Sequence, residues 1–147
     1  MKLSLGCDEA AYELKMIIKK HLQQAGHEIT DMGCHDGAAV LYPNIAFAVA
    51  EDVIKGNAER AILLCGTGIG MAISANKVPG IRAAQCHDTY SAERASRSND
   101  AQIITIGARV VGPELAKAIV DKFLASTFDG GKSQPKVDLI SEYEARN

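Results

Sequence analysis

The chain has 147 residues and a mass of 15.6 kDa, which is the size of a single domain. Hydrophobic residues make up 47% and charged residues 23%, so disorder along the whole chain is excluded. The net charge of −2 excludes the strongly basic surface of a nucleic-acid-binding protein. No apolar run approaches the roughly 20 residues that span a bilayer, and Asp8 comes too early for a signal peptide. We therefore expect a cytoplasmic protein without nucleic-acid or membrane partners.

Four cysteines are scattered through the sequence without any C-x-x-C pair: Cys7, Cys34, Cys65 and Cys86. Disulfides are not expected in a chain of this length and composition that has no secretory signal. Free thiols fit a reducing compartment, where packing, metal binding and catalysis are their possible uses.

Short apolar runs alternate with longer amphipathic segments along the chain. The apolar runs predict strands at residues 3–6, 27–32, 61–65, 81–86 and 103–107. Helical spacing of apolar residues predicts helices at residues 10–25, 44–55, 89–97 and 113–124, and a short helix ending near residue 76. This alternation predicts an α/β fold, a three-layer, Rossmann-like, open parallel sheet of five strands with helices on both faces.

The C-terminal residues 128–147 are more polar and begin with Asp129-Gly130-Gly131. A helix is predicted from about Pro135, because proline is favoured in the first helical turn. We expect residues 1–147 to form one domain, in which residues 128–147 are a tail and helix outside the sheet.

Polar residues follow the predicted strands at the edge where an open parallel sheet binds its ligands. These residues are Cys7-Asp8-Glu9, Cys65 with the glycines after it, Cys86-His87-Asp88 and Gly107-Ala108-Arg109. We expect the chemistry to lie among them.

The segment after the third predicted strand contains three alternate glycines, Gly66, Gly68 and Gly70. It lacks the Gly-Lys-Ser/Thr of a phosphate-binding P-loop, and Met71 stands where a dinucleotide fingerprint has its third glycine. Alternate glycines before a helix direct several backbone N–H groups at one point, where an anion binds and a neighbouring thiolate is stabilised. The alternative is a tight turn beside a buried, inert Cys65.

Metal binding is a weaker alternative for Cys7, Cys65, Cys86 and His87. Zinc sites usually contain ligand pairs that are close in sequence, and here only Cys86-His87 is adjacent. We therefore predict no metal.

Several charged residues have both a structural and a functional interpretation. Asp8 and Glu9 could stabilise a helix N-terminus or bind substrate. Arg109 could be a solvated surface residue or a ligand of the substrate. Lys132 and Lys136 are four residues apart, so they could share a helix face as solvated residues or as a phosphate clamp.

Motifs over nearly the whole chain resemble the ribose-5-phosphate isomerase B family, which includes the galactose-6-phosphate isomerase subunits. The motifs are Gly6-Cys7-Asp8, Tyr42-Pro43, residues 65–71, 75–84 and 107–110, His87-Asp88, Ser91-Ala92, Asn99-Asp100-Ala101 and Gly130-Gly131. The resemblance implies an aldose–ketose isomerase that acts on a sugar phosphate through a cis-enediol(ate), with neither metal nor cofactor.

The resemblance also implies roles for individual residues. Cys65 would move a proton between C1 and C2, and the main chain and side chains of Gly66, Thr67, Gly68, Ile69 and Gly70 would hold the enediolate. The substrate would be bound by Asp8, Glu9, Tyr42 and Asn99. Its phosphate group would be bound by Lys132, Lys136 and Arg109. Family sites form between subunits, so a homodimer or homotetramer is expected, with Ser98, Asn99 and Arg109 reaching into a neighbouring site.

Four departures from the usual family pattern bear on the substrate. Glu9 and Ser98 stand at positions where the family usually has histidines. Lys132 and Lys136 replace the two arginines that usually bind the phosphate. Leu41 precedes Tyr42 at a position where Asp is common. The histidine at position 98 opens the furanose ring in ribose isomerases of the family.

The loss of a ring-opening residue suits a four-carbon substrate. A tetrose 4-phosphate cannot close a furanose because its O4 is esterified. Residues 88–95 with Ser98-Asn99 also look similar to relatives that act on tetrulose phosphates from erythritol breakdown. We therefore expect interconversion of D-erythrulose 4-phosphate and D-erythrose 4-phosphate. The alternatives are ribose 5-phosphate isomerisation in the pentose phosphate pathway, with His87 or water opening the ring, and a non-catalytic sugar-phosphate-binding relative or partner subunit.

Overall fold

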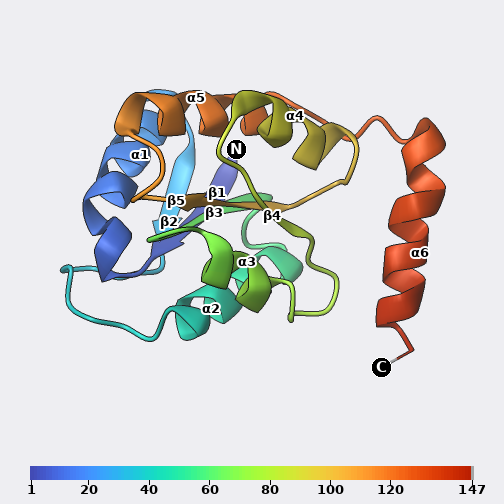
Figure 1. Cartoon of the computed structure of the whole chain (residues 1–147), viewed down its shortest axis with the longest axis horizontal. Coiled ribbons are helices and arrows are strands. Elements are labelled where there is room, and N and C mark those ends of the chain that lie inside the picture. The colour runs from blue at the N-terminus through green and yellow to red at the C-terminus, as the bar shows by residue number, and fades with distance from the viewer. Residues whose placement is uncertain (147) are drawn as a thin grey trace.

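Five parallel strands form the centre of the structure, a computed structural model that describes residues 1–146 (Figure 1). They are β1 (Lys2–Cys7), β2 (Glu28–Asp31), β3 (Arg60–Cys65), β4 (Ala83–Gln85) and β5 (Ile103–Gly107). The order in the sheet is β2-β1-β3-β5-β4, so β2 and β3 lie on opposite sides of β1. The carboxyl ends of β1 and β3 therefore flank the point where the strand order reverses, which is the usual ligand-binding position in such sheets.

Helices cover both faces of the sheet, as the sequence predicts. On one face lie α1 (Tyr12–Gln24), α4 (Thr89–Arg97) and α5 (Pro113–Leu124), and on the other α2 (Tyr42–Ile54) and α3 (Ile69–Ala75) (Figure 1). The predicted α/β fold with an open, five-stranded parallel sheet is confirmed. Within residues 1–146, no helix has both the length and the apolar character that crossing a membrane requires.

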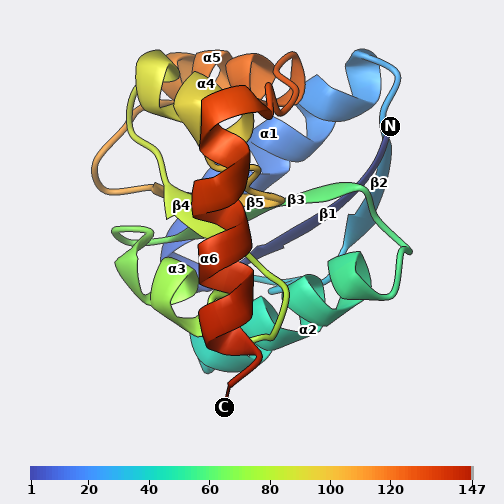
Figure 2. The same cartoon turned by 90° about the vertical axis from the view of Figure 1, so that its right-hand side faces the viewer.

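The last helix, α6 (Gln134–Glu144), lies outside the three layers. It follows a short 3₁₀ turn, η2 (Gly131–Ser133), and crosses in front of the β4 edge of the sheet (Figure 2). The Gly80 N–H donates to Glu144 Oε2 at 2.8 Å and connects this helix to the body. Most of α6 is exposed, and Val137 is its one buried residue.

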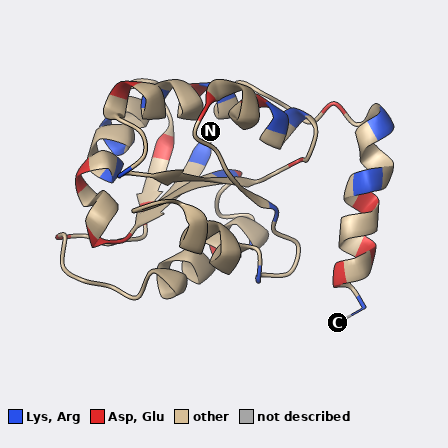
Figure 3. Cartoon of the chain, viewed as in Figure 1, with Lys and Arg blue, Asp and Glu red and all other residues tan. Residues whose placement is uncertain are grey.

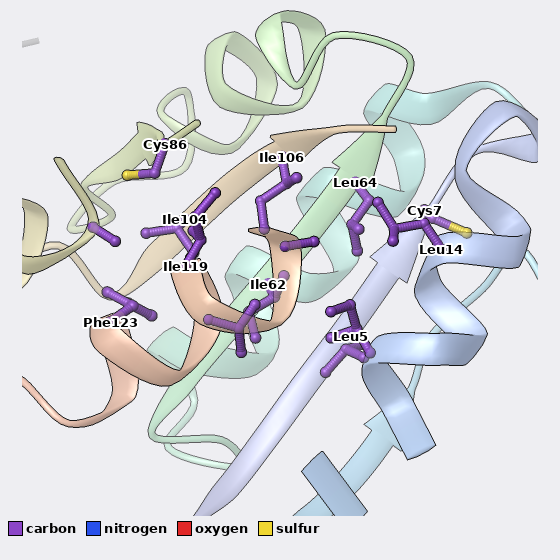
Figure 4. Packing of buried hydrophobic residues seen from close by; sticks show 14 of the residues in the cluster. Leu5, Cys7, Leu14, Ile62, Leu64, Cys86, Ile104, Ile106, Ile119 and Phe123 are labelled. Carbon is purple, nitrogen blue, oxygen red and sulfur yellow. The ribbon is translucent and has the colours of Figure 1, made fainter. Parts of the chain in front are cut away.

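The hydrophobic core has one part on each face of the sheet, because successive strand residues point to opposite faces. In β3, Ile62 and Leu64 join the cluster under α1, α4 and α5, part of which Figure 4 shows. Leu63 and Cys65 join the cluster above α2 and α3. A strand that is buried on both faces reads as one continuous apolar run, which explains why the β3 sequence has no polar alternation.

The observed bounds differ from the predicted ones mainly at the sheet edge and at helix starts. The strand predicted at residues 81–86 is only Ala83–Gln85, because the Arg82 N–H donates to the Gln102 side chain at 2.8 Å instead of to a strand. The helix predicted from residue 10 begins with a 3₁₀ turn, η1 (Glu9–Ala11), which Asp8 caps by accepting the Ala11 N–H at 3.2 Å.

Candidate active site

Residues 65–70, called the thiol loop below, connect β3 to α3, and a backbone N–H of this loop binds the Cys65 sulfur. Cys65 is 5% exposed and packs partly in the α2–α3 core cluster. The Gly68 N–H donates to Cys65 Sγ at 3.1 Å, and the Ile69 N–H donates to Thr67 Oγ1 at 3.2 Å. Gly68 has a φ of +78°, a conformation that glycine adopts readily. The loop therefore directs one N–H toward the thiol and the next toward the threonine hydroxyl.

The carbonyl groups of the thiol loop face β5 and the residues after it. Ala108 N–H donates to Cys65 O at 2.9 Å, and Arg109 N–H donates to Gly66 O at 3.0 Å. Gly107 lies directly against the loop, since a Cβ on Gly107 would be 2.7 Å from the Thr67 carbonyl carbon. The end of β5 is thus the surface on which the loop rests.

Two further side chains bind loop carbonyls, and the sequence analysis missed both. Gln85 Nε2 donates to Thr67 O at 2.7 Å, and Thr105 Oγ1 donates to Gly68 O at 2.7 Å. Neither residue belongs to a motif with a recognised spacing, and Thr105 lies within an apolar strand. A polar threonine inside an otherwise apolar strand is the one sequence signal that could have identified Thr105 as a functional residue.

Asp8 lies beside the thiol loop, since its N–H donates to Leu64 O at 3.2 Å. Partial burial, together with the nearby Glu9 carboxylate, raises the pKa of Asp8 above its usual value. A carboxyl group that protonates more easily is suited to hydrogen bonding with substrate oxygens.

The Glu9 side chain binds neither Lys132 nor Lys136, the two lysines expected to hold the phosphate. Its Oε2 accepts the Val40 N–H at 3.2 Å, and hydrogen bonds from its own N–H and that of Val40 lower its pKa. Glu9 therefore stays ionised and holds the segment that leads into α2.

Two more predicted site residues lie on the thiol loop of their own chain. The Tyr42 ring lies so close to Gly70 that a side chain at position 70 would overlap it. A Cβ on Gly66 would be 3.4 Å from Arg109 Nη1, so the Arg109 side chain covers this glycine. The Arg109 N–H donates to Gly66 O, which holds the residue beside its own loop, and a contribution of Arg109 to a neighbouring subunit's site stays a prediction.

A second group contains the remaining predicted site residues, which are Ser98, Asn99, Lys132 and Lys136. Ser98 ends α4 and accepts a hydrogen bond from Arg94 Nη1 at 3.3 Å. The Asp129 N–H donates to Arg97 O at 3.1 Å, which brings the segment before η2 to the end of α4. Asn99 lines a cavity of about 370 Å³ whose other walls include β4 and α6.

The two groups lie at opposite ends of the strands. A helix that connects parallel strands runs back to the amino end of the next strand, so the end of α4 lies far from the carboxyl end of β3. Figure 3 shows basic residues near the start of the η2–α6 segment, on the side of the molecule away from α1. Within one chain, the second group is therefore not assembled with Cys65, Asp8 and the thiol loop.

His87 has a structural role. Its Nε2 accepts the Gly107 N–H at 2.9 Å, so this nitrogen is already occupied. Burial raises the pKa values of Cys7 and Cys86 to about 12. Residues 1–146 bring no three His, Cys, Asp or Glu side chains together in an arrangement that could hold a metal.

Comparison with known proteins identifies the family. A family model described as "Ribose/Galactose Isomerase" matches residues 3–140. The chain belongs to the ribose/galactose isomerase family. It is therefore an aldose–ketose isomerase of a family whose named members convert sugar phosphates.

Named relatives of this isomerase align over almost their full length. Ribose-5-P isomerase B of Listeria innocua is 54% identical over 147 residues, covering 100% of this chain and 99% of the relative. D-erythrulose-4-phosphate isomerase of Pectobacterium atrosepticum is 53% identical over 145 residues, covering 98% and 95%. The solved ribose-5-phosphate isomerase B of Clostridium thermocellum superposes with a TM-score of 0.98 at 44% identity, covering 99% of each chain.

Proposed function

We propose that this isomerase interconverts the aldose and ketose forms of a sugar phosphate, with Cys65 as the base and no metal or cofactor. The Cys65 thiolate removes a proton from C1 of the ketose, and the electron pair of that C–H bond forms the C1=C2 double bond. The C2 oxygen becomes the enediolate oxygen, which preorganised N–H donors stabilise. A proton moves from O1 to O2, and the thiol returns its proton to C2, which leaves an aldehyde at C1.

The observation that carries this proposal is the Gly68 N–H, which donates to Cys65 Sγ at 3.1 Å. A backbone donor aimed at a sulfur stabilises the thiolate, which is the form that accepts a proton. Asp8 supports the proposal, because its pKa is raised and its backbone is hydrogen-bonded to the end of β3. Thr67 lies in the same loop, and its hydroxyl is a second donor for the substrate oxygens.

Replacing the sulfur tests the assignment of the base. We expect Cys65→Ala to lower kcat by at least about 1,000-fold, because the loss of a proton-transfer group removes one of the largest contributions to the rate. The melting temperature and the affinity for a sugar phosphate, measured by calorimetry, remain close to wild type. Turnover that survives in Cys65→Ala would remove Cys65 from the mechanism.

We infer that D-erythrulose 4-phosphate is the substrate, converted to D-erythrose 4-phosphate. Ser98 replaces the ring-opening histidine, and its hydroxyl is hydrogen-bonded to Arg94. His87, the other candidate for ring opening, already accepts the Gly107 N–H through Nε2. A tetrose phosphate needs no ring opening, and the Pectobacterium relative is named for the four-carbon substrate.

Ribose 5-phosphate is the second candidate, because the Listeria relative is named for it. Measuring kcat/KM for both substrates with one enzyme preparation separates them. We expect the tetrulose phosphate to be favoured by at least about tenfold, the discrimination that a pocket achieves for one carbon unit. A clear preference for ribose 5-phosphate would refute the four-carbon assignment.

We further propose a homodimer, or a tetramer of such dimers, whose sites lie between subunits. The thiol loop, Asp8, Glu9 and Tyr42 would come from one chain. The partner would supply Ser98 and Asn99, with Lys132 and Lys136 binding the phosphate. Support comes from the separation of these two groups within one chain and from the exposed apolar side chains on α6. The four unpaired cysteines fit the cytoplasm as the compartment.

A further inference from the structure

Gln85 and Thr105 hold two consecutive carbonyl groups of the thiol loop. They are register partners in the β4–β5 ladder, so both side chains project from the same face of the sheet. Each donates a hydrogen bond of 2.7 Å, Gln85 to Thr67 O and Thr105 to Gly68 O. Together they bind two successive peptide groups, Gln85 from an exposed position and Thr105 from a buried one.

The peptide group held by Gln85 is the one that faces the catalytic sulfur. Thr67 O and the Gly68 N–H belong to one planar trans peptide, so they point in opposite directions. Gln85 binds the oxygen at one end, and the N–H at the other end donates to Cys65 Sγ at 3.1 Å. A hydrogen bond to the carbonyl also polarises the peptide, which strengthens its N–H as a donor.

Thr105 acts on the next peptide group. Its hydroxyl binds Gly68 O, and the N–H of the same peptide, that of Ile69, donates to Thr67 Oγ1 at 3.2 Å. With its oxygen accepting this bond, the Thr67 hydroxyl keeps its proton for another acceptor. Thr105 is fully buried, so its bond to the loop does not compete with solvent.

We propose that Gln85, supported by Thr105, is a positioning residue that stabilises the Cys65 thiolate through the Thr67–Gly68 peptide group. Gln85 touches neither the sulfur nor the reacting carbons. Its effect on turnover rests on the proposed function, in which Cys65 is the base, whereas its effect on the thiol is independent of any reaction.

The test follows the ionisation of Cys65 by its rate of alkylation with iodoacetamide as a function of pH. Peptide mass spectrometry identifies the modified cysteine, and burial raises the pKa values of Cys7 and Cys86 to about 12, which keeps these two thiols protonated. In Gln85→Leu we expect the midpoint of the profile to rise by about 0.5 to 1 pH unit. We also expect kcat to fall about three- to tenfold with KM within about twofold, because the lost bond is a single hydrogen bond.

Matched variants separate positioning from a general structural effect. Gln85→Lys retains an N–H donor, so its midpoint returns to the wild-type value or below it. Gln102→Leu removes the bond from Nε2 to Gly80 O at 2.8 Å and also the bond that Oε1 accepts from the Arg82 N–H, both away from Cys65, and it leaves the midpoint unchanged. Thr105→Val lowers kcat, whereas Thr105→Ser, which keeps the hydroxyl, restores it.

Two outcomes overturn the proposal: an unchanged midpoint in Gln85→Leu, or an equal rise in Gln102→Leu. A raised midpoint with unchanged kcat supports the role of Gln85 and contradicts Cys65 as the base. The two proposals therefore fail in distinguishable ways.

Discussion

Gly107 shows how strongly the thiol loop depends on a residue that has no side chain. A Cβ at this position would be 2.7 Å from the Thr67 carbonyl carbon and 2.8 Å from its Cα. Those are backbone atoms, which cannot move aside without displacing the whole thiol loop.

We expect Gly107→Ala to lower kcat by about 100-fold, because a displacement of about 1 Å at a catalytic group has effects of this size. Steady-state kinetics would measure the loss of kcat, and a thermal melt would measure any change in stability. Gly112→Ala is the matched control, since nothing lies within 4 Å of a Cβ on Gly112. Equal activities of the two variants would show that the loop tolerates the displacement.

Sequence reasoning succeeded at the residue scale where chemistry imposes a pattern. Three alternate glycines after a buried strand predict a turn whose N–H groups point inward, and the N–H of Gly68 does donate to Cys65, whereas anion binding by this turn stays a prediction. It failed for Gln85 and Thr105, because a side chain that binds a loop carbonyl from another strand has no fixed spacing to that loop. Such pairs depend on strand register, which only the folded sheet defines.

At the scale of elements, a buried ion pair joins α1 to the edge strand β2. Lys15 is fully buried, and its Nζ donates to Asp31 Oδ1 at 2.7 Å and to Cys34 O at 2.5 Å. Lys19 Nζ binds the other Asp31 oxygen at 3.2 Å. Because β2 has only one neighbouring strand, these contacts hold it against the helix layer.

We expect Lys15→Met to lower the free energy of unfolding by about 3 kcal/mol, since removing one partner of a buried pair leaves the other charge poorly compensated. Urea denaturation would measure the change, with kcat close to wild type in native buffer. Lys20→Met, an exposed position on the same helix, is the control. A loss below about 1 kcal/mol would show that Lys19 alone satisfies Asp31.

The same pair predicts a pH dependence. Burial tends to raise the pKa of Asp31, but hydrogen bonds from Lys15, the Gly33 N–H and Lys19 outweigh it and lower the pKa. A lowered folded-state pKa gives stability that is complete above the unfolded value, about 4, and is lost as the pH falls through the folded one. The stability difference between wild type and Lys15→Met should therefore shrink below about pH 4. A difference that stays constant down to pH 2 would contradict this assignment.

At the scale of the whole molecule, the order and type of the elements could be predicted, but the arrangement of the site could not. Apolar periodicity predicted the helix Thr89–Arg97 and the strand Ile103–Gly107 with their observed bounds. The tertiary topology determines which site residues lie together at the same edge of the sheet. The placement of Arg109 on its own loop, with Ser98 and Lys132 elsewhere, could not be inferred from spacing.

The separation of the two residue groups predicts complementation between inactive chains. Cys65→Ala and Asn99→Ala would each be nearly inactive alone. If each site takes Cys65 from one chain and Asn99 from its partner, co-expression of both variants in equal amounts would restore about a quarter of wild-type activity, because half of the dimers are mixed and each has one intact site. A mixture that stays as inactive as its components would place each site within one chain.

The exposed apolar side chains of α6 bear on the assembly proposed above. Leu139 is 62% exposed, Ile140 50% and Tyr143 67%, so the helix offers apolar area that a second chain would cover. When assembly completes the site, specific activity falls on dilution as the chains separate. A substrate that bridges two chains binds only the assembled form, so saturating substrate would slow this loss and hold the oligomer together.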